Sequence, residues 1–409
     1  MIFGRKKATD TSTAPRIEAH AAHEVLTGPS GPRRSSAYCD LNVGFHRLRF
    51  LKDGTQAFPA MLEAIAQAKS TIRLETYILE DDRIGIAFAD ALIERARAGV
   101  EVNLLFDTWG SSVSSGYVDR LLENGVRAVA FRPILQSLQE VKLVRQVSRR
   151  NHRKSLIIDS RLAFTGGVNL ANDYACRDDG GGGFRDTHLE FEGPAALELQ
   201  YFFLRTWRKA GGALIDENKY SHEGRRPDPL VHIVTNDMHR GRVSIRVSYR
   251  QAIREAKHRI YISNAYFLPT LSLLRGLIDA AKRGVDVRVM VAGTTDVTAV
   301  KLATRTMYGR LLHAGIRLYE WHGRVLHAKT AVIDGHWATV GSSNLDQQSL
   351  RLNMEANAII RDERFATAME KMFHEDLEHC EEITLDGWHQ RPVWERAASW
   401  AAYLFRDWL

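Results

Sequence analysis

The sequence has very few cysteines and no long apolar run. Its three cysteines, Cys39, Cys176 and Cys380, are far apart among 409 residues. They form neither a CxxC metal pair nor a disulfide framework, so we expect a reducing compartment. No apolar stretch approaches the roughly 20 residues that span a bilayer, so no transmembrane helix is expected. Residues 1–7 are basic but lack a following apolar segment, so no secretory signal peptide is expected.

A strong compositional bias is also missing, and what remains is a modest excess of positive charge. Hydrophobic residues make up 44% and charged residues 26% of the chain, which is ordinary for a globular protein. Lys and Arg number 56 against 49 Asp and Glu, which leaves a net charge of +7. Such a surplus suits nucleic acid, an acidic lipid surface or merely a solvated basic face. Charge alone therefore does not choose a partner.

The pattern of the chain predicts two similar α/β domains between two atypical ends. Residues 1–45 are rich in Arg, Ser, Pro and Gly without a sustained apolar period, which indicates a flexible basic tail. Helical and strand patterns alternate through residues 46–215 and again through residues 225–385. Residues 386–409 form a Trp-rich amphipathic segment. This helix is expected either to dock on its own domain or to anchor the protein at a membrane interface.

The second half of the chain repeats the first. The order helix, strand, helix, strand is expected in both halves, at residues 59–68, 72–78, 85–98 and 100–106 and again at 251–257, 259–266, 271–283 and 285–291. Individual residues match as well, since Ala98-Gly99-Val100-Glu101-Val102 corresponds to Arg283-Gly284-Val285-Asp286-Val287. Two long copies indicate a duplicated domain, because solenoid repeats are shorter and more numerous.

Each half carries the same pattern of polar residues. The first half contains the segment NHRKSLIID at residues 151–159, followed by GGVN at 166–169. The second contains LHAKTAVID at 326–334, followed by GSSN at 341–344. Both read H-x-K-x4-D-x6-G-x2-N. At average residue usage one such window has a chance on the order of 10^-7, so its occurrence twice is not a coincidence.

The residue types in this pattern suit the transfer of a phosphoryl group. In an extended segment side chains two apart share a face, so His152 and Lys154 point together, as do His327 and Lys329. Two such sets facing each other would surround one phosphorus atom with imidazoles, ammonium groups and amides. One His can attack phosphorus while the other protonates the leaving oxygen. This chemistry needs neither a cofactor nor a metal, and a zinc site is disfavoured because an ammonium group beside each His repels the cation.

These two motifs resemble the paired HKD motifs of the phospholipase D superfamily. Within it the chain is most similar to bacterial cardiolipin synthases of the short type that lacks N-terminal transmembrane helices. The resemblance covers about residues 46–385 and includes Glu75-Thr76-Tyr77, Asn264–Pro269 and His336–Asp346. It implies two phospholipase D-like domains, each a mixed β-sheet flanked by helices, with the active site at their pseudo-twofold interface. It also implies that a phosphatidyl group passes from one phospholipid to the hydroxyl of another, with phosphatidylglycerol as the expected substrate.

The resemblance further implies a role for each motif residue. His152 would be the nucleophile that forms a phosphatidyl-histidine intermediate, and His327 the general acid and later the base, although the near symmetry leaves that order open. Four side chains would bind the phosphoryl oxygens: Lys154, Lys329, Asn169 and Asn344. A carboxylate some thirty residues downstream orients each His in this family, and the matching candidates are Asp186 and Glu355. Asp159 and Asp334 complete the catalytic motif, and we expect them to close their own strand ends.

Two other function classes remain open. The first is a hydrolase, either a phospholipase D or a nuclease, although no clear basic groove with stacking aromatic side chains is visible. The second is a basic membrane-binding or nucleic-acid-binding protein with a decayed site, against which the two intact motifs argue. We expect a peripheral enzyme at the cytoplasmic face of the cell membrane, in contact with anionic phospholipids and without a nucleic-acid partner. The basic stretch 135–154 is expected either to contact lipid headgroups or to form a solvated helix. The oligomeric state is not predicted.

Overall fold

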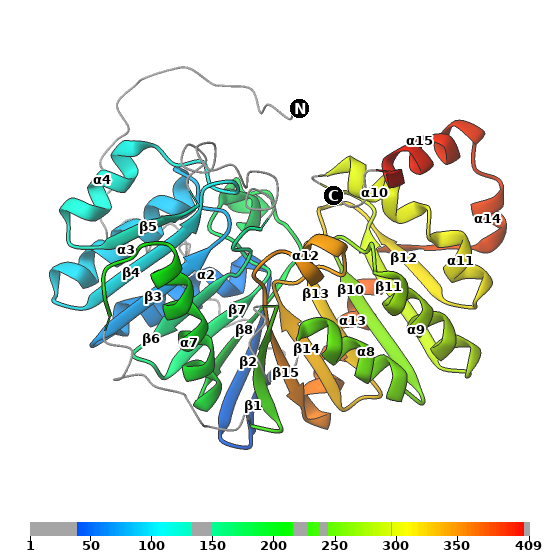
Figure 1. Cartoon of the computed structure of the whole chain (residues 1–409), viewed down its shortest axis with the longest axis horizontal. Coiled ribbons are helices and arrows are strands. Elements are labelled where there is room, and N and C mark those ends of the chain that lie inside the picture. Colours follow the sequence, from blue (N-terminus) through cyan, green and yellow to red (C-terminus); the bar gives the residue numbers. More distant parts are fainter. Residues whose placement is uncertain (1–38, 133–148, 216–227, 237–243, 296, 405–409) are drawn as a thin grey trace.

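The structure consists of two eight-stranded mixed β-sheets that meet at the centre of the molecule, with helices on both faces of each sheet (Figure 1). It is a computed structural model that describes residues 39–132, 149–215, 228–236, 244–295 and 297–404. The prediction of two α/β domains with mixed sheets is confirmed. The predicted tail lies almost entirely outside the described residues. However, Cys39–Val43, which we assigned to that tail, forms the first strand, so the first domain includes residues before 46.

The first sheet has the strand order β1-β2-β8-β7-β6-β3-β4-β5. Its strands are β1 (Cys39–Val43), β2 (His46–Lys52), β3 (Thr71–Thr76), β4 (Glu101–Asp107), β5 (Arg127–Phe131), β6 (Ser155–Ile158), β7 (Leu162–Gly166) and β8 (Thr187–Glu192). β3, β4 and β5 are parallel, and the remaining neighbours are antiparallel. The helices of this half are α2 (Asp53–Gln67), α3 (Arg83–Arg97), α4 (Ser115–Glu123) and α7 (Pro194–Lys209).

The second sheet repeats this arrangement with the order β16-β12-β11-β10-β13-β14-β15-β9. Its strands are β9 (Val231–Thr235), β10 (Arg259–Asn264), β11 (Asp286–Ala292), β12 (Arg317–Trp321), β13 (Lys329–Ile333), β14 (Trp337–Gly341), β15 (Ala356–Arg361) and β16 (Cys380–Ile383). Its helices are α8 (Ile245–Glu255), α9 (Leu271–Lys282), α10 (Thr298–Arg305), α11 (Tyr308–His313), α12 (Gln347–Arg351) and α13 (Glu363–Leu377). β3, β6 and β7 therefore correspond to β10, β13 and β14, as the duplication in the sequence predicts.

Two helices begin earlier than the sequence pattern predicts. α2 begins at Asp53, although the predicted helix began at Pro59, which lies inside the helix and does not end it. α8 begins at Ile245, because the Ser244 side chain accepts a hydrogen bond from the Val247 backbone N–H and caps the helix. The apolar period alone did not reveal these first turns, which depend on capping and on packing against the sheets.

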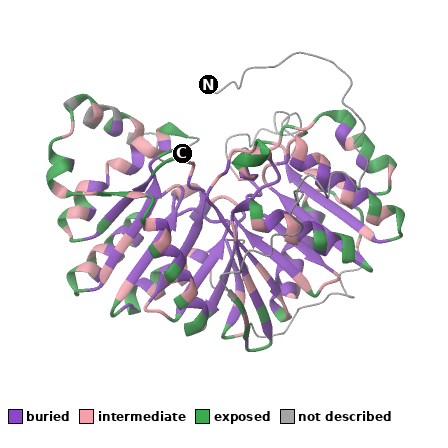
Figure 2. Cartoon of the chain, turned by 180° about the vertical axis from the view of Figure 1, so that it is seen from behind, coloured by how far each residue is buried: buried purple, intermediate pink, exposed green. Residues whose placement is uncertain are grey.

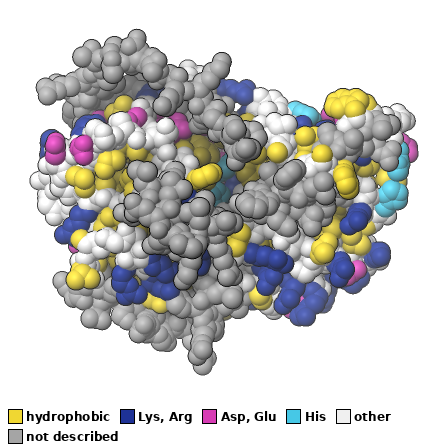
Figure 3. Space-filling model, turned by 45° about the horizontal axis from the view of Figure 1, so that its top comes forward, with side chains coloured by type: hydrophobic (Ala, Val, Ile, Leu, Met, Phe, Trp, Pro, Cys, Tyr) yellow, Lys and Arg dark blue, Asp and Glu magenta, His cyan; other side chains and the backbone are white. Residues whose placement is uncertain are grey.

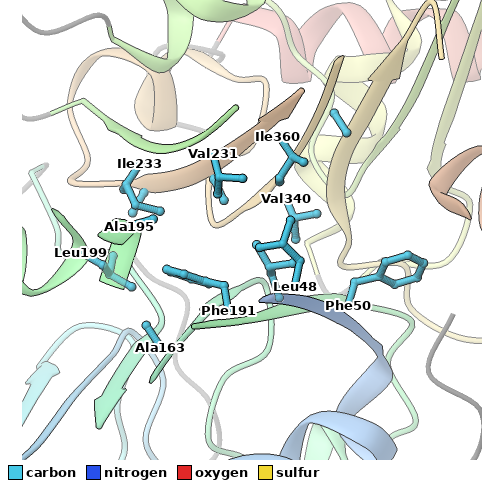
Figure 4. Packing of buried hydrophobic residues seen from close by; sticks show 14 of the residues in the cluster. Leu48, Phe50, Ala163, Phe191, Ala195, Leu199, Val231, Ile233, Val340 and Ile360 are labelled. Carbon is cyan, nitrogen blue, oxygen red and sulfur yellow. The ribbon is translucent and has the colours of Figure 1, made fainter. Parts of the chain in front are cut away.

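One apolar core joins the two halves. Strands β2, β8, β14 and β15 contribute Leu48 and Phe191 from the first half and Val340 and Ile360 from the second, all fully buried (Figure 4). α7 and α13 close the same cluster. Figure 2 shows that the strands are buried while the outer helices expose one face. Because cores are close-packed, this shared core holds the two halves, and hence their motifs, in a fixed relation.

The C-terminal segment folds as two helices against its own domain. α14 (Leu385–His389) and α15 (Val393–Leu404) follow β16, and α15 packs along α10. Trp388 of α14 is buried against Tyr308, at 5.0 Å between ring centroids. Residues 405–409 lie outside the described part of the chain, as do residues 135–148 of the predicted basic stretch. Over the described residues, none of the helices combines the length and apolarity needed to cross a membrane.

Candidate functional site

Each motif histidine is held by a short backbone ladder to the opposite half of the chain. The His152 N–H donates to the Met354 carbonyl at 3.0 Å, and the Met354 N–H donates to the Arg150 carbonyl at 2.8 Å. In the same way the His327 N–H donates to the Arg185 carbonyl at 2.7 Å, and the Arg185 N–H donates to the Val325 carbonyl at 2.8 Å. The two motifs are thus brought together at the centre of the molecule, each fixed by backbone from the other sheet.

The two imidazoles pair with carboxylates in a crossed arrangement. His152 Nδ1 lies 2.9 Å from a Glu355 carboxylate oxygen, and His327 Nδ1 lies 2.7 Å from an Asp186 carboxylate oxygen. We expected each carboxylate to serve the His upstream of it in the same half, and the contacts correct that pairing. The reason is the backbone ladder, which places residue 355 beside His152 and residue 186 beside His327. Both candidate carboxylates therefore contact a motif histidine, but each contacts the one in the other half.

The two motif lysines are buried next to the histidines. Lys154 Nζ donates to the His152 carbonyl oxygen at 2.7 Å, and Lys329 Nζ donates to the His327 carbonyl oxygen. Burial lowers the pKa of Lys154 to about 7, the Glu355 carboxylate opposes that shift, and the charge of Lys329 adds to it. Bringing an anionic phosphate between the two ammonium groups would relieve this penalty, so the pair is poised to bind an anion.

The two motif asparagines differ in their contacts. Asn169 accepts the Ile78 N–H at 3.1 Å and donates to the Tyr174 hydroxyl at 2.6 Å. The side-chain oxygen of Asn344 is buried and has no hydrogen-bond partner within the described ranges. A buried polar atom without a partner is costly, so a ligand donor or an ordered water is expected there.

Aromatic rings from the first half line both histidines. The ring of Tyr77 meets His152 edge-on at 4.6 Å between centroids, and Lys154 Nζ lies 5.1 Å from the centroid of that same ring. The ring of Tyr174 meets His327 at 5.3 Å, with its hydroxyl 3.3 Å from Nδ1. We did not predict either contact. Tyr77 belongs to a segment that supports the family resemblance, whereas nothing in the sequence pattern marks Tyr174.

A buried glutamate fixes the strand that carries the first motif. Glu75 accepts a hydrogen bond from the Asn151 amide at 3.0 Å and another from the Ser155 hydroxyl at 2.7 Å, on either side of His152 and Lys154. In addition, Asp107 accepts the backbone N–H of Asn151 at 2.9 Å. Both carboxylates therefore position the motif without being part of it.

The motif aspartates lie at the far ends of their strands, where they close turns. Asp159 accepts backbone N–H groups of three consecutive residues, Lys69, Ser70 and Thr71, at 2.7 to 2.8 Å. Asp334 does the same for Lys257, His258 and Arg259 at 2.8 to 2.9 Å. Partial burial opposes ionisation of both, but these backbone donors prevail and hold each pKa below its usual value. The contacts agree with the expected strand-closing role.

Burial changes the pKa of one group in each histidine–carboxylate pair. Burial lowers the pKa of His152, the Glu355 carboxylate opposes that shift, and the ammonium group of Lys154 reinforces it. A neutral imidazole is therefore favoured at position 152 near neutral pH. Beside the other histidine, burial raises the pKa of Asp186 to about 6, although Lys329 opposes the shift. Near neutral pH Asp186 is therefore mostly ionised and can accept the Nδ1–H of His327.

Two imidazoles, two ammonium groups and two amides that converge on one place can stabilise a phosphoryl group in transfer. The described residues contain no group of three or more His, Cys, Asp or Glu side chains that could hold a metal ion. What the residues offer instead is nucleophilic and acid–base chemistry with cationic stabilisation of phosphoryl oxygens.

Comparisons with known proteins point in the same direction. The family described as "Cardiolipin synthase, PLD-like domain" matches residues 61–179 and 249–377. Cardiolipin synthase B of Salmonella typhimurium is 35% identical over 374 residues, covering 88% of this chain and 87% of that protein. Cardiolipin synthase 2 of Bacillus anthracis is 33% identical over 362 residues, covering 87% of this chain and 70% of that protein. The crystal structure of phosphatidylserine synthase from Haemophilus influenzae shares the fold, with a TM-score of 0.69 at 13% identity, over 96% of this chain and 100% of that one.

Proposed function

The chain belongs to the phospholipase D superfamily as a cardiolipin synthase-type phospholipid transferase, and on this premise we propose the lipids and residues involved. The proposed reaction transfers the phosphatidyl group of one phosphatidylglycerol to a hydroxyl of a second, which gives cardiolipin and glycerol. The observation that carries the assignment of residues is the crossed pairing of His152 with Glu355 and of His327 with Asp186. A carboxylate on Nδ1 fixes the tautomer of each ring, so the chemistry takes place at Nε2.

In the first step Nε2 of neutral His152 attacks the phosphorus atom of the donor lipid. The bond from phosphorus to the oxygen of the headgroup glycerol breaks, and protonated His327 gives its Nε2 proton to that oxygen. Glycerol leaves as a neutral alcohol, and His327 becomes neutral. The ring of the phosphatidyl-histidine carries a positive charge, which the Glu355 carboxylate stabilises.

In the second step the acceptor lipid reverses these roles. Its hydroxyl gives a proton to Nε2 of His327, and its oxygen attacks phosphorus. The phosphorus–nitrogen bond breaks, its electron pair returns to His152, and cardiolipin is released. Through both steps the ammonium groups of Lys154 and Lys329 and the amides of Asn169 and Asn344 stabilise the negative charge on the non-bridging oxygens.

The substrates require that the protein work at a lipid surface. Each buried CH2 group of a lipid contributes about 0.8 kcal/mol, so two long acyl chains do not leave a bilayer for water at a useful rate. We therefore propose a peripheral enzyme on the cytoplasmic face of the membrane, where anionic phospholipids attract a chain of net charge +7.

Separation of the products from labelled phosphatidylglycerol by thin-layer chromatography tests the proposal. We expect labelled cardiolipin together with one glycerol for each cardiolipin, and neither product from the His152→Ala variant. Phosphatidic acid as the sole lipid product would contradict transfer and favour hydrolysis. Cleavage of single-stranded DNA by the same preparation, abolished by His152→Ala, would favour a nuclease.

A further inference from the structure

Several exposed apolar side chains lie at the sheet edge that holds the candidate site. The motif strand β6 begins directly after Lys154 and runs antiparallel to β3, so the carboxyl ends of the parallel strands β3 and β4 lie on the side of the site. The same holds for β10 and β11 in the second half, because Asn264 at the end of β10 pairs with Lys329. The segments that follow the ends of β3, β4, β10 and β11 therefore surround the route by which a substrate reaches the histidines.

The segments that follow these strand ends expose large apolar side chains. Trp109 comes two residues after β4 and is 59% exposed, and Leu271 begins α9 after β10 and is 57% exposed. α10 follows β11, and α15 packs beside it at the same upper edge in Figure 1. Trp394 and Trp400 of α15 are 68% and 64% exposed. Figure 3, in which this edge comes forward, shows a hollow with histidine atoms inside it and hydrophobic side chains beside it and on the part formed by α15.

These tryptophans are held in place by the rest of the structure. Asp107 accepts the Trp109 N–H at 2.9 Å with one carboxylate oxygen and the Asn151 N–H at 2.9 Å with the other, so Trp109 is tied to the residue before His152. The guanidinium of Arg150 lies 5.2 Å from the Trp109 ring centroid. On the other side, Glu395 of α15 pairs with Arg305 of α10 at 3.7 Å. Exposed aromatic side chains on a rigid frame are suited to binding, because little conformational entropy is lost.

We propose that Trp109, Leu271, Trp394 and Trp400 form a membrane-docking face that inserts into the headgroup layer of the bilayer around the mouth of the site. This proposal rests on the proposed function. Tryptophan suits this depth, since it has a large apolar body and an N–H donor that remains hydrated. A second copy of the chain on the same face would close the route by which a lipid reaches the histidines, so the bilayer is the occupant that fits.

Vesicle sedimentation with the full chain tests the docking face. The probes are vesicles of phosphatidylglycerol and phosphatidylcholine, and the variants are Trp394→Ala/Trp400→Ala and the same pair with Trp109→Ala. We expect the double variant to bind about tenfold more weakly and the triple variant more weakly still, as loss of interfacial tryptophans predicts. Quenching of tryptophan fluorescence by lipids brominated near the headgroup should fall in the same order.

Phe45 supplies the matched control. It is 85% exposed in the turn between β1 and β2, at the opposite edge of the sheet, and Phe45→Ala should bind vesicles as the wild type does. Unchanged binding of the triple variant, an equal loss in Phe45→Ala, or a change of oligomeric mass in place of a change in vesicle binding would each overturn the docking face. Activity on short-chain, monomeric phosphatidylglycerol separates the two proposals. Cardiolipin formed there by the wild type supports the function, and its absence overturns the function whatever the vesicles show.

Discussion

The two halves of the molecule present the same polar residues in different surroundings. Tyr77 lies against His152, whereas the corresponding position at the end of β10 is Ala265. Tyr174, also from the first half, lies against His327. The second half instead places a buried carboxylate, Asp346, where the first has Ala171, and burial raises the pKa of Asp346 to about 7.

Two copies of one domain can thus place the same residue types in different environments. Duplication supplies two imidazoles on the same fold. The groups that neighbour each imidazole affect its pKa. Burial favours the neutral form of His152, while His327 shares its environment with Asp186, whose pKa is about 6. An attacking imidazole must be neutral, and the lowered pKa of His152 meets that requirement. On this ground we propose His152 as the nucleophile, an order that the sequence motif leaves open.

Removal of either imidazole should have the largest effect. His152→Ala and His327→Ala are each expected to lower kcat by about 10^4-fold or more, because each step needs both groups. A phosphatidyl substrate with p-nitrophenol as its leaving group distinguishes the two histidines, because p-nitrophenolate leaves without needing a proton. His327→Ala should then release one equivalent in a burst, and His152→Ala none. A burst from His152→Ala alone would reverse the assignment.

The orienting carboxylates should rank next. Glu355→Gln and Asp186→Asn are each expected to lower kcat by about 10^2 to 10^3-fold, because each replaces the charged, acceptor-only carboxylate by an amide that can also donate and so favour the wrong tautomer. Because Asp186 contacts His327, the proposed general acid, the p-nitrophenol substrate should restore the rate of the first step in Asp186→Asn. It should not restore that rate in Glu355→Gln, because Glu355 contacts the proposed nucleophile. Rescue of the opposite variant would contradict the crossing.

The pH dependence of kcat/KM should be bell-shaped between about 6 and about 7. Below about 6 Asp186 is protonated and no longer accepts from His327, and above about 7 Lys154 loses the charge that binds phosphate. Lys154→Arg stays charged and should move the alkaline limb upward at a lower maximal rate. The matched Lys329→Arg variant should keep the wild-type alkaline limb, and a shift of the limb in that variant would refute the role of Lys154.

The motif aspartates should give the smallest change in activity. Asp159→Asn and Asp334→Asn keep a residue type that tolerates the positive φ of 51° and 52° found there, but lose the charge that gathers three N–H groups. We expect each to lower the free energy of unfolding by about 1 to 3 kcal/mol, measured by denaturant titration. The folded variants should retain activity within about threefold, since neither side chain lies at the site. A much larger loss in a stably folded variant would make the aspartate part of the site.

The duplicated motif and its alternating pattern allowed much of the fold and site to be predicted. Strands are well marked in buried runs such as Leu156-Ile157-Ile158, so the two sheets and the histidine–lysine pairs followed from the sequence. The residues that complete the site come from segments after strand ends, where no periodic pattern of apolar residues marks the structure. Tyr174 and Ser342, which donates to Glu355, are of this kind.

The pairing of each carboxylate with the histidine of the other half could not be predicted from the sequence, for a different reason. A carboxylate about thirty residues downstream of each His pointed to Asp186 and Glu355, but it paired each one with the His of its own half, which the contacts correct. Which His each carboxylate contacts depends on how the two sheets pack together. In that packing the backbone of Arg185 pairs with His327 and that of Met354 pairs with His152. Such contacts are set by the shared core and not by local pattern.

The most direct test is the identity of the residue that carries the phosphatidyl group. The His327→Ala variant is mixed with the p-nitrophenol substrate, quenched, digested and analysed by mass spectrometry. We expect one phosphatidyl group on the peptide that contains His152, and none when His152 is also replaced by Ala. A phosphatidyl group on any other residue, or a burst of p-nitrophenol without a covalent adduct, would contradict it.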